Sequence, residues 1–192
     1  MQNHFEADRY GFLPSITYWK MSWIVLIDNS GSMGSHALDP NSLAIDVKNA
    51  IDTMLEEINN ISEEREILSY IRIITFNDLV SYAVGNRNHG EYITEAINTW
   101  RNFESIPYGG TNIASAIHEA VESIRIDRRE YLFSSSWLSP VLMLITDGMV
   151  NLADRVGNSL NNLKNIRKCQ TIRASIGLRH KYSIELDPFA SR

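Results

Sequence analysis

The 192-residue sequence lacks several patterns that would indicate particular classes of protein. It has one cysteine, Cys169, so it has no internal disulfide and no Cys/His cluster for a zinc site. No segment approaches the roughly 18 to 20 consecutive apolar residues that span a bilayer. The first twenty residues also lack the continuous apolar stretch of a signal peptide. These absences predict a soluble, cytoplasmic protein that does not enter a membrane.

Positive charge is also scarce. The chain has 18 Lys and Arg against 23 Asp and Glu, a formal net charge of -5, and no long basic run. A general nucleic-acid binder needs a basic face to displace counterions, so we do not expect a nucleic-acid partner. The hydrophobic fraction of 44% and charged fraction of 21% are typical of one soluble globular domain.

Short apolar runs alternate with amphipathic segments along the chain. Runs typical of strands buried on both faces occupy residues 23–27, 70–76, 141–145 and 172–178. Apolar residues three and four apart predict helices after Asp39-Pro40, at 91–100, at 112–126 and at 158–168. A short turn joins 70–76 to 80–84, which predicts an antiparallel hairpin. The pattern predicts a three-layer, doubly wound α/β fold whose sheet is mostly parallel with one antiparallel edge hairpin. Residues 1–20 are predicted to be an N-terminal arm and residues 21–192 the domain.

Oxygen-bearing side chains stand at three places where a strand ends or a helix begins. These motifs are D-N-S-G-S at 28–32, G-G-T-N at 109–112 and T-D-G at 146–148. In an open parallel sheet, ligands bind outside the carboxyl ends of the strands, where such segments meet. Hard cations such as Mg²⁺ prefer oxygen ligands. The sequence therefore predicts a divalent-cation site made by Asp28, Ser30, Ser32, Thr111 and Asp147.

These three motifs, in this order on an alternating α/β pattern, resemble the metal-ion-dependent adhesion site (MIDAS) of von Willebrand factor A (vWA) domains. The resemblance extends from about Trp23 to about Ala190 and implies a Rossmann-like vWA fold. It implies that Ser30 and Ser32 ligate Mg²⁺ (or Mn²⁺) directly, and Thr111 directly or through water. Asp28 and Asp147 would act largely through water. A protein partner would supply an Asp or Glu as the last ligand.

Two narrower expectations follow from the same resemblance. The chain is similar to small stand-alone bacterial vWA proteins, such as those in tellurium-resistance clusters. That similarity implies a bacterial stress-response role, with a kinase, a phosphatase or an AAA+ ATPase among its associates. Only a short tail follows residues 172–178 where the family usually adds a last helix, so we expect a domain truncated at that edge.

The predicted partner contacts are the loop residues beside the motifs, which are Met33, His36, Tyr108 and Met149.

Three functions stay open on the sequence alone. The first is a non-enzymatic interaction module, the second a Mg²⁺-dependent hydrolase or phosphatase, and the third a structural subunit with a purely stabilising metal. Phosphotransferases with a similar sheet require a second carboxylate two residues after the nucleophilic Asp, but position 30 is Ser. There is no GxxxxGK[ST] phosphate loop and no lysine near the motifs, so the first function is favoured. A simpler alternative makes Asp28, Ser30 and Ser32 turn residues, and Thr111 only a helix N-cap.

Overall fold

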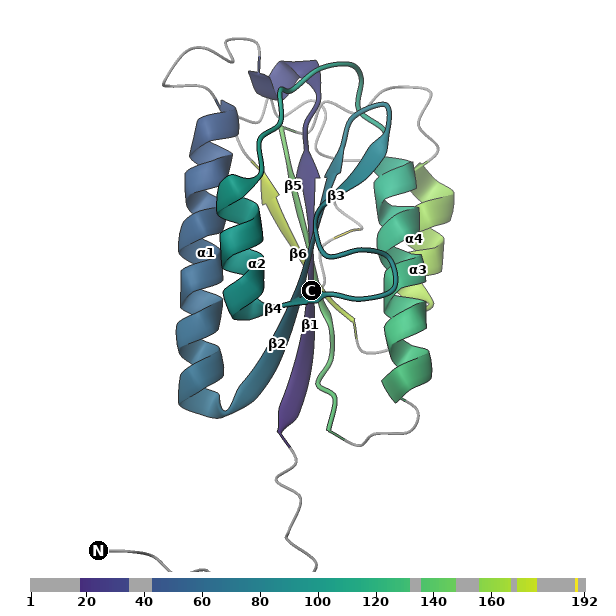
Figure 1. The fold of residues 1–192 in the computed structure, drawn as a ribbon. Coiled ribbons are helices and arrows are strands. Elements are labelled where there is room, and N and C mark those ends of the chain that lie inside the picture. Colours follow the sequence, from purple (N-terminus) through teal and green to yellow (C-terminus); the bar gives the residue numbers. More distant parts are fainter. Residues whose placement is uncertain are drawn as a thin grey trace, which may run out of the picture.

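The computed structural model describes residues 18–34, 43–131, 136–147, 156–166, 169–175 and Phe189. In this part of the chain, one six-stranded sheet lies between two pairs of helices (Figure 1). Helices α1 (Leu43–Arg65) and α2 (Ile93–Asn102) cover one face. Helices α3 (Ile113–Tyr131) and α4 (Val156–Lys164) cover the other. The predicted three-layer α/β architecture is confirmed.

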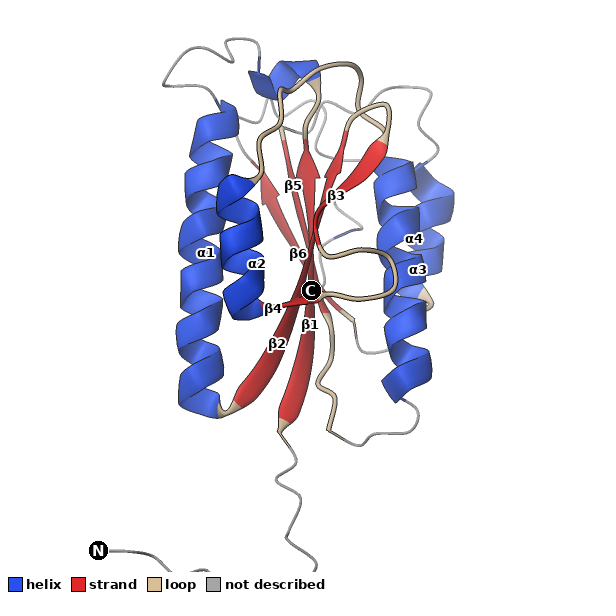
Figure 2. Cartoon of the chain, viewed as in Figure 1, coloured by secondary structure: helices blue, strands red, loops and turns tan. Residues whose placement is uncertain are grey.

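The sheet is mostly parallel, as predicted. Its strands are β1 (Trp19–Asp28), β2 (Ile67–Phe76), β3 (Val80–Val84), β4 (Glu91–Tyr92), β5 (Val141–Thr146) and β6 (Gln170–Ser175). The order is β3-β2-β1-β5-β6, and β4 also pairs with β2. Strand β1 runs parallel to β2 and β5, and β5 parallel to β6, whereas β3 and β4 are antiparallel to β2. The carboxyl ends of the four parallel strands therefore lie at one end of the sheet, the upper end in Figure 2.

Several predicted boundaries differ from the structure. Strands β1 and β2 begin earlier than the predicted runs at 23–27 and 70–76, and α4 is Val156–Lys164 where 158–168 was predicted. Glu91 and Tyr92 do not begin the helix but form β4, because they pair with Ile71 and Tyr70 of β2. The Glu91 carboxylate also accepts hydrogen bonds from the Gly85 amide at 2.9 Å and the Thr99 hydroxyl at 2.6 Å. The last strand begins at Gln170, two residues earlier than predicted. The capping prediction at Asp39-Pro40 and most of the N-terminal arm lie outside the described residues. No described helix is long and apolar enough to cross a membrane.

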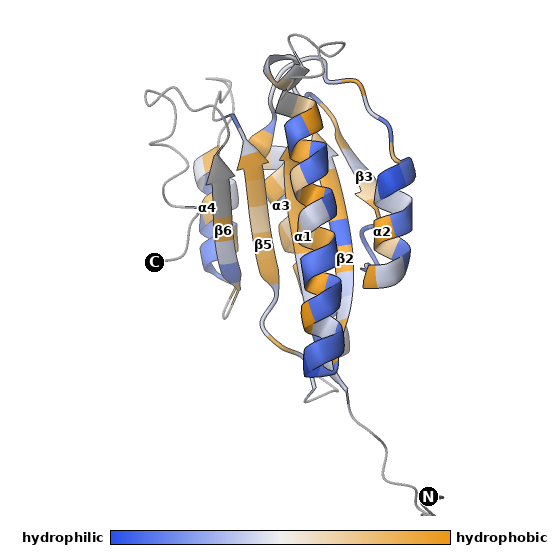
Figure 3. Ribbon diagram, turned by 90° about the vertical axis from the view of Figure 1, so that its left-hand side faces the viewer, coloured by the Kyte–Doolittle hydropathy of each residue, from blue (hydrophilic) through white to orange (hydrophobic). Residues whose placement is uncertain are grey.

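Each central strand is buried on both faces, which explains the uninterrupted apolar runs. Val25 and Ile27 of β1 pack with α1 and α2, whereas Ile24 and Leu26 pack with α3 and α4. Figure 3 shows a largely apolar β5 in the sheet behind α1, and apolar and polar residues alternate along α1. Side chains alternate along a strand, so the same periodicity places Asp28 on the α3 side, at the end of β1.

Candidate metal centre

Asp28 is the last residue of β1, and its side chain is 2% exposed. One carboxylate oxygen accepts the Ser30 amide at 2.9 Å, and the other accepts the Thr146 hydroxyl of the neighbouring strand β5 at 2.6 Å. Burial raises the pKa of Asp28; the hydrogen bonds from Ser30 and Thr146 oppose this effect, and the nearby charge of Asp147 adds to it. A buried carboxylate beside a second acid, with only neutral donors, is an environment that a cation would stabilise.

The serines of the first motif lie in the turn directly after β1. Residues Gly31–Gly34 form the 3-10 helix η1, at the carboxyl end of the sheet. The curl of the chain brings the Ser30 and Ser32 hydroxyl oxygens to 3.0 Å from each other. Ser30 is buried, and its carbonyl accepts the Met33 amide at 3.0 Å. The turn therefore gathers the alternate residues 28, 30 and 32, as the sequence pattern predicted.

The second motif is held against the first by backbone hydrogen bonds. The Gly31 amide donates to the Gly109 carbonyl at 3.1 Å, and the Tyr108 amide donates to the Asn29 carbonyl at 3.1 Å. Thr111 follows this contact and is buried, with 7% exposure. These bonds join segments that are 78 residues apart or more in the sequence, so the packing of the two loops sets where Thr111 lies relative to Asp28.

Thr111 is not the N-cap of the following helix. The side-chain oxygen of Asn112 accepts the Ser115 amide at 3.1 Å, the usual hydrogen bond of a capping residue. The alternative in which Thr111 serves only as the cap is therefore wrong. The alternative for Asp28 is correct in part, because its bond to the Ser30 amide is a turn bond. That turn role does not explain the second bond, from Thr146.

Asp147 follows β5 directly and is 8% exposed. Its charge acts on the Asp28 carboxyl, so the two acids lie within electrostatic reach of each other. The structure thus brings Asp28, Ser30 and Ser32 together by direct hydrogen bonds and places Asp147 within electrostatic reach of Asp28. Thr111 is buried in the loop that is bonded to the first motif. Gly148 lies outside the described residues.

The donor set fits a hard divalent cation. Two carboxylates and three hydroxyls offer oxygen alone, which suits Mg²⁺ or Mn²⁺. Across the described ranges, no group of three or more His, Cys, Asp or Glu forms an alternative site. The arrangement can therefore hold a cation while the protein supplies mostly neutral ligands.

The four predicted partner contacts have different outcomes. The Met33 prediction is wrong: the residue is 1% exposed and packs with α1 in the core. Tyr108 is 57% exposed beside the second motif, which leaves it available to a partner. His36 and Met149 lie outside the described residues.

Sequence reasoning missed the contribution of the β2–β3 turn. The Asn77 carbonyl accepts the Asn112 amide at 2.8 Å, and a carboxylate oxygen of Asp78 accepts the Gly110 amide at 2.9 Å. These residues give the second motif another anchor, at the end of β2. The only sequence signal was the Asn-Asp pair itself, which is typical of any tight turn.

Replacing Asp78 with alanine is expected to weaken metal binding by about tenfold, because the loop that carries Thr111 loses an anchor. Asp78→Asn keeps an acceptor for the Gly110 amide and should retain most of the affinity. Isothermal titration with Mg²⁺ measures both. Equal losses in the two variants would instead assign the effect to the Asp78 charge.

Replacing Gly109 with alanine is expected to destabilise the fold by about 1–3 kcal/mol. Gly109 has φ +73°, and an added Cβ would lie 2.3 Å from the Asp78 carboxylate. Gly157→Ala is the matched control, since a Cβ there meets nothing within 4 Å. Thermal unfolding should show a loss for the first variant only, and comparable melting temperatures would contradict the strain at Gly109.

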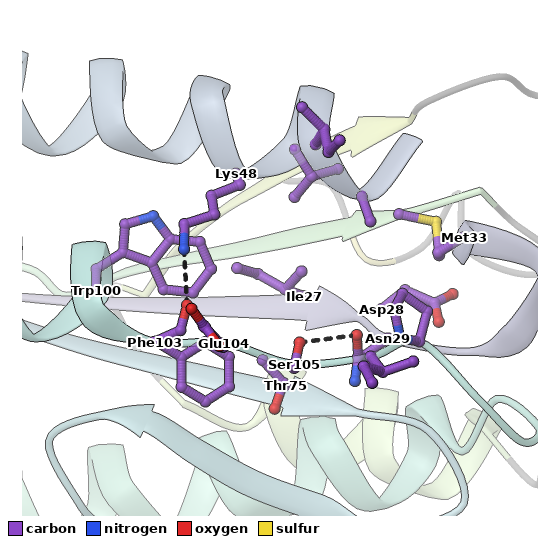
Figure 4. Close-up of a pocket in the computed structure, with 15 residues that line it drawn as sticks. Ile27, Asp28, Asn29, Met33, Lys48, Thr75, Trp100, Phe103, Glu104 and Ser105 are labelled. Atoms are coloured by element: carbon purple, nitrogen blue, oxygen red, sulfur yellow. Dashed lines mark hydrogen bonds between the residues drawn. The ribbon is translucent and has the colours of Figure 1, made fainter. Parts of the chain in front are cut away.

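A cavity of about 690 Å³ adjoins the centre between β1, α1 and the loop after α2. Figure 4 shows Asp28 and Asn29 at one end of it and Trp100 with Lys48 at the other. The Lys48 ammonium donates to the Phe103 carbonyl at 2.7 Å, and the Ser105 hydroxyl donates to the Asn29 side-chain oxygen at 3.2 Å. Lys48 thus lines the same cavity as Asp28, but its ammonium is bound by the loop after α2.

The fold is that of an α/β domain with oxygen-bearing side chains gathered at the carboxyl ends of its parallel strands. A family model for the von Willebrand factor type A domain matches residues 23–149. The chain therefore belongs to the von Willebrand factor type A domain family. A comparison with curated protein sequences gives no match.

Solved structures agree on the fold. An aerotolerance-related membrane protein from Bacteroides fragilis superposes with TM-score 0.58 at 17% identity, covering 83% of this chain and 69% of its own. Manganese-loaded TRAP protein from Plasmodium vivax gives 0.58 at 20% identity, covering 91% and 65%. Proximal thread matrix protein 1 from mussel byssus, with a zinc-occupied MIDAS motif, gives 0.62 at 16%, covering 91% and 40%. The chain thus spans less than two thirds of the last two proteins.

Proposed function

We propose that this domain is a non-enzymatic, metal-dependent protein-interaction module. The observation that carries the proposal is the buried Asp28 carboxylate, hydrogen-bonded to the turn of Ser30 and Ser32 and close to the charge of Asp147, at the carboxyl end of the sheet. Thr111 is buried in the adjoining loop. The family is known for metal-dependent protein interaction, and two structural neighbours carry manganese or zinc. For this chain, the oxygen donors favour Mg²⁺ or Mn²⁺.

Each residue has a distinct part in the proposal. The cation would be ligated by Ser30, Ser32 and Thr111. Its charge would be balanced by Asp28 and Asp147, largely through water. When bound, the cation supplies an electrophilic position for an Asp or Glu carboxylate of the partner. Thr146 holds the Asp28 carboxylate in place, and Asn29 holds the loop at 103–108 against the site.

The absence of catalysis is part of the proposal. Ser30 occupies the place where a phosphotransferase would need a second carboxylate, and the Lys48 ammonium is engaged by the Phe103 carbonyl. A phosphatase would instead hydrolyse a generic phosphoester in Mg²⁺ and stop in EDTA. If wild type showed such turnover and Asp147→Ala did not, the domain would be a hydrolase and the proposed interaction function would be wrong.

The narrower proposal concerns the biological setting. Similarity to stand-alone bacterial proteins of tellurium-resistance clusters suggests a cytoplasmic stress-response role, with a kinase, phosphatase or AAA+ ATPase as associates. The identities of the proteins retained in an affinity pull-down would show whether such associates bind this domain.

An affinity pull-down from native lysate tests the main proposal. Wild type and Asp147→Ala are immobilised in parallel, each in Mg²⁺ or EDTA, and the retained proteins are identified. We expect a partner that only wild type with Mg²⁺ retains. Charge reversal of one exposed partner Asp or Glu should then abolish retention.

Retention in all four lanes would contradict the proposal, because the contact would then lie on another face. A melting temperature that falls in EDTA while partner binding is unchanged would support the structural-metal alternative instead. The two readouts, retention and melting temperature, separate adhesion from stabilisation.

A further inference from the structure

The surface beside the metal centre carries a cluster of exposed apolar side chains. Ile106, Leu79 and Tyr108 are 75%, 66% and 57% exposed, the highest values among the exposed large hydrophobic residues of the described part of the chain. All three line one hollow of about 260 Å³. Single exposed apolar residues are ordinary, but several gathered around one hollow indicate a binding surface.

This hollow, here called the apolar hollow, adjoins the segment that carries the first motif. Asn29, which follows Asp28 directly, forms part of its lining. The same residue accepts hydrogen bonds from the Ser105 hydroxyl and the Tyr108 amide, at 3.2 and 3.1 Å. The hollow and the metal ligands therefore share one loop, and one short partner segment can reach both, since extended residues advance about 3.3 Å each.

The charge around the hollow indicates what it binds. Its lining contains no charged side chain. The two segments that form its walls each carry an exposed acid, Asp78 beside Leu79 and Glu104 beside Phe103. Those carboxylates disfavour an acidic group in the hollow, so a neutral apolar side chain is the complementary occupant.

We propose that the partner carries a large apolar residue within two positions of its metal-binding Asp or Glu, and that the apolar hollow binds this residue. The inference rests on the proposed function, because it assigns the partner acid to the metal. Burial of Ile106, Leu79 and Tyr108 by the partner gives affinity, and the hollow distinguishes this partner from other acidic segments.

A displayed library of random heptapeptides tests the inference. The full chain is immobilised in Mg²⁺, and selected peptides are synthesised and titrated against wild type, Leu79→Ser/Ile106→Ser and Ile61→Ser. Ile61 is the matched control, since it is a 49% exposed residue on α1, outside the hollow. Thermal melts and Mg²⁺ titrations check that fold and metal site are intact in each variant.

We expect selected peptides to pair an Asp or Glu with a large apolar residue one or two positions away. Their affinity should fall at least tenfold in Leu79→Ser/Ile106→Ser and stay unchanged in Ile61→Ser, with Mg²⁺ affinity equal in all three. Peptides that need Mg²⁺ but bind the double variant as wild type would overturn the inference and leave the proposed function standing.

Two other outcomes contradict the proposal in different ways. Peptides that bind equally in EDTA, or no selected peptide in Mg²⁺, would count against the proposed function and the inference together. A Mg²⁺-dependent dimer in sedimentation that dissociates in Leu79→Ser/Ile106→Ser would make the occupant a second copy of this chain, not a foreign acidic segment.

Discussion

Replacing Arg72 with alanine is expected to lower the free energy of unfolding by about 3–5 kcal/mol, because an uncompensated charge would stay buried. Arg72 lies in the middle of β2 and is 1% exposed. Its guanidinium binds both carboxylate oxygens of Asp127 on α3, at 2.6 and 2.7 Å. It also donates to the carbonyls of Asn86 and Asn88 at 3.0 and 3.2 Å.

The buried pair fastens α3 to the sheet at the end away from the metal centre. The Ser22 hydroxyl of β1 donates to Asp127 at 2.9 Å, so the polar network spans two strands, one helix and the loop after β3. Asp127→Ala should cost as much as Arg72→Ala, since it leaves the guanidinium without its counter-charge. Equilibrium urea unfolding measures both variants.

A double variant separates the stability contributed by the Arg72–Asp127 interaction from the cost of leaving one charge unpaired. Arg72→Met/Asp127→Leu removes both charges and refills the space with apolar atoms, so it should lose far less than either alanine variant. Mg²⁺ affinity should be unchanged in this folded double variant. Additive losses in the double variant would show that Arg72 and Asp127 act independently, contrary to the geometry.

The sequence predicted the frame of the fold well because burial leaves a periodic signature. The runs at 23–27 and 141–145 became β1 and β5, buried on both faces. The Arg72–Asp127 pair was not predictable, because a single arginine inside a strand and one aspartate in a helix carry no periodic signal. The start of α2 was wrong for a similar reason, since Glu91 and Tyr92 pair with Ile71 and Tyr70 of β2, about 20 residues earlier in the chain.

At the site, the motifs predicted the candidate metal ligands but not the residues whose hydrogen bonds hold the ligand loops in place. The alternation at 28, 30 and 32 was sufficient to predict that those side chains meet, since local geometry brings them together. Asn29 and Asp78 act through backbone groups of a segment more than 25 residues away. Met33 was misassigned because a methionine in a glycine-rich turn has the same local pattern whether it faces solvent or the core.

The chemistry of the site links metal binding to stability. Burial of the Asp28 carboxylate raises its pKa above the value in the unfolded chain. Without metal, that shift means the ionised form opposes folding: the cost is absent below the unfolded pKa and develops as pH rises through the folded pKa. A bound cation would offset this cost, so the domain should be more stable with metal at neutral pH.

Asp28→Asn is therefore expected to abolish Mg²⁺ binding yet raise the melting temperature in EDTA at pH 7. The amide removes the buried charge, and it can still accept the Ser30 amide and donate to the Thr146 hydroxyl oxygen. Wild type should gain about 5–10 °C when Mg²⁺ reaches a hundred times its dissociation constant, and the variant should gain nothing. Differential scanning calorimetry in EDTA and in Mg²⁺ measures all four states.

The direction of each change makes this pair of measurements decisive. A merely structural Asp28 would lose stability in both conditions when substituted, because its turn bond and its bond to Thr146 would weaken. A metal-site Asp28 gains stability in EDTA when it is replaced by Asn and loses the response to Mg²⁺. Because burial raises the pKa of Asp28, the gain should disappear as the pH falls below the ordinary value of an Asp carboxyl and the wild-type group becomes neutral. If Asp28→Asn kept the full Mg²⁺ response, Asp28 would not belong to the metal centre. The observation that carries the proposed function would then no longer support it.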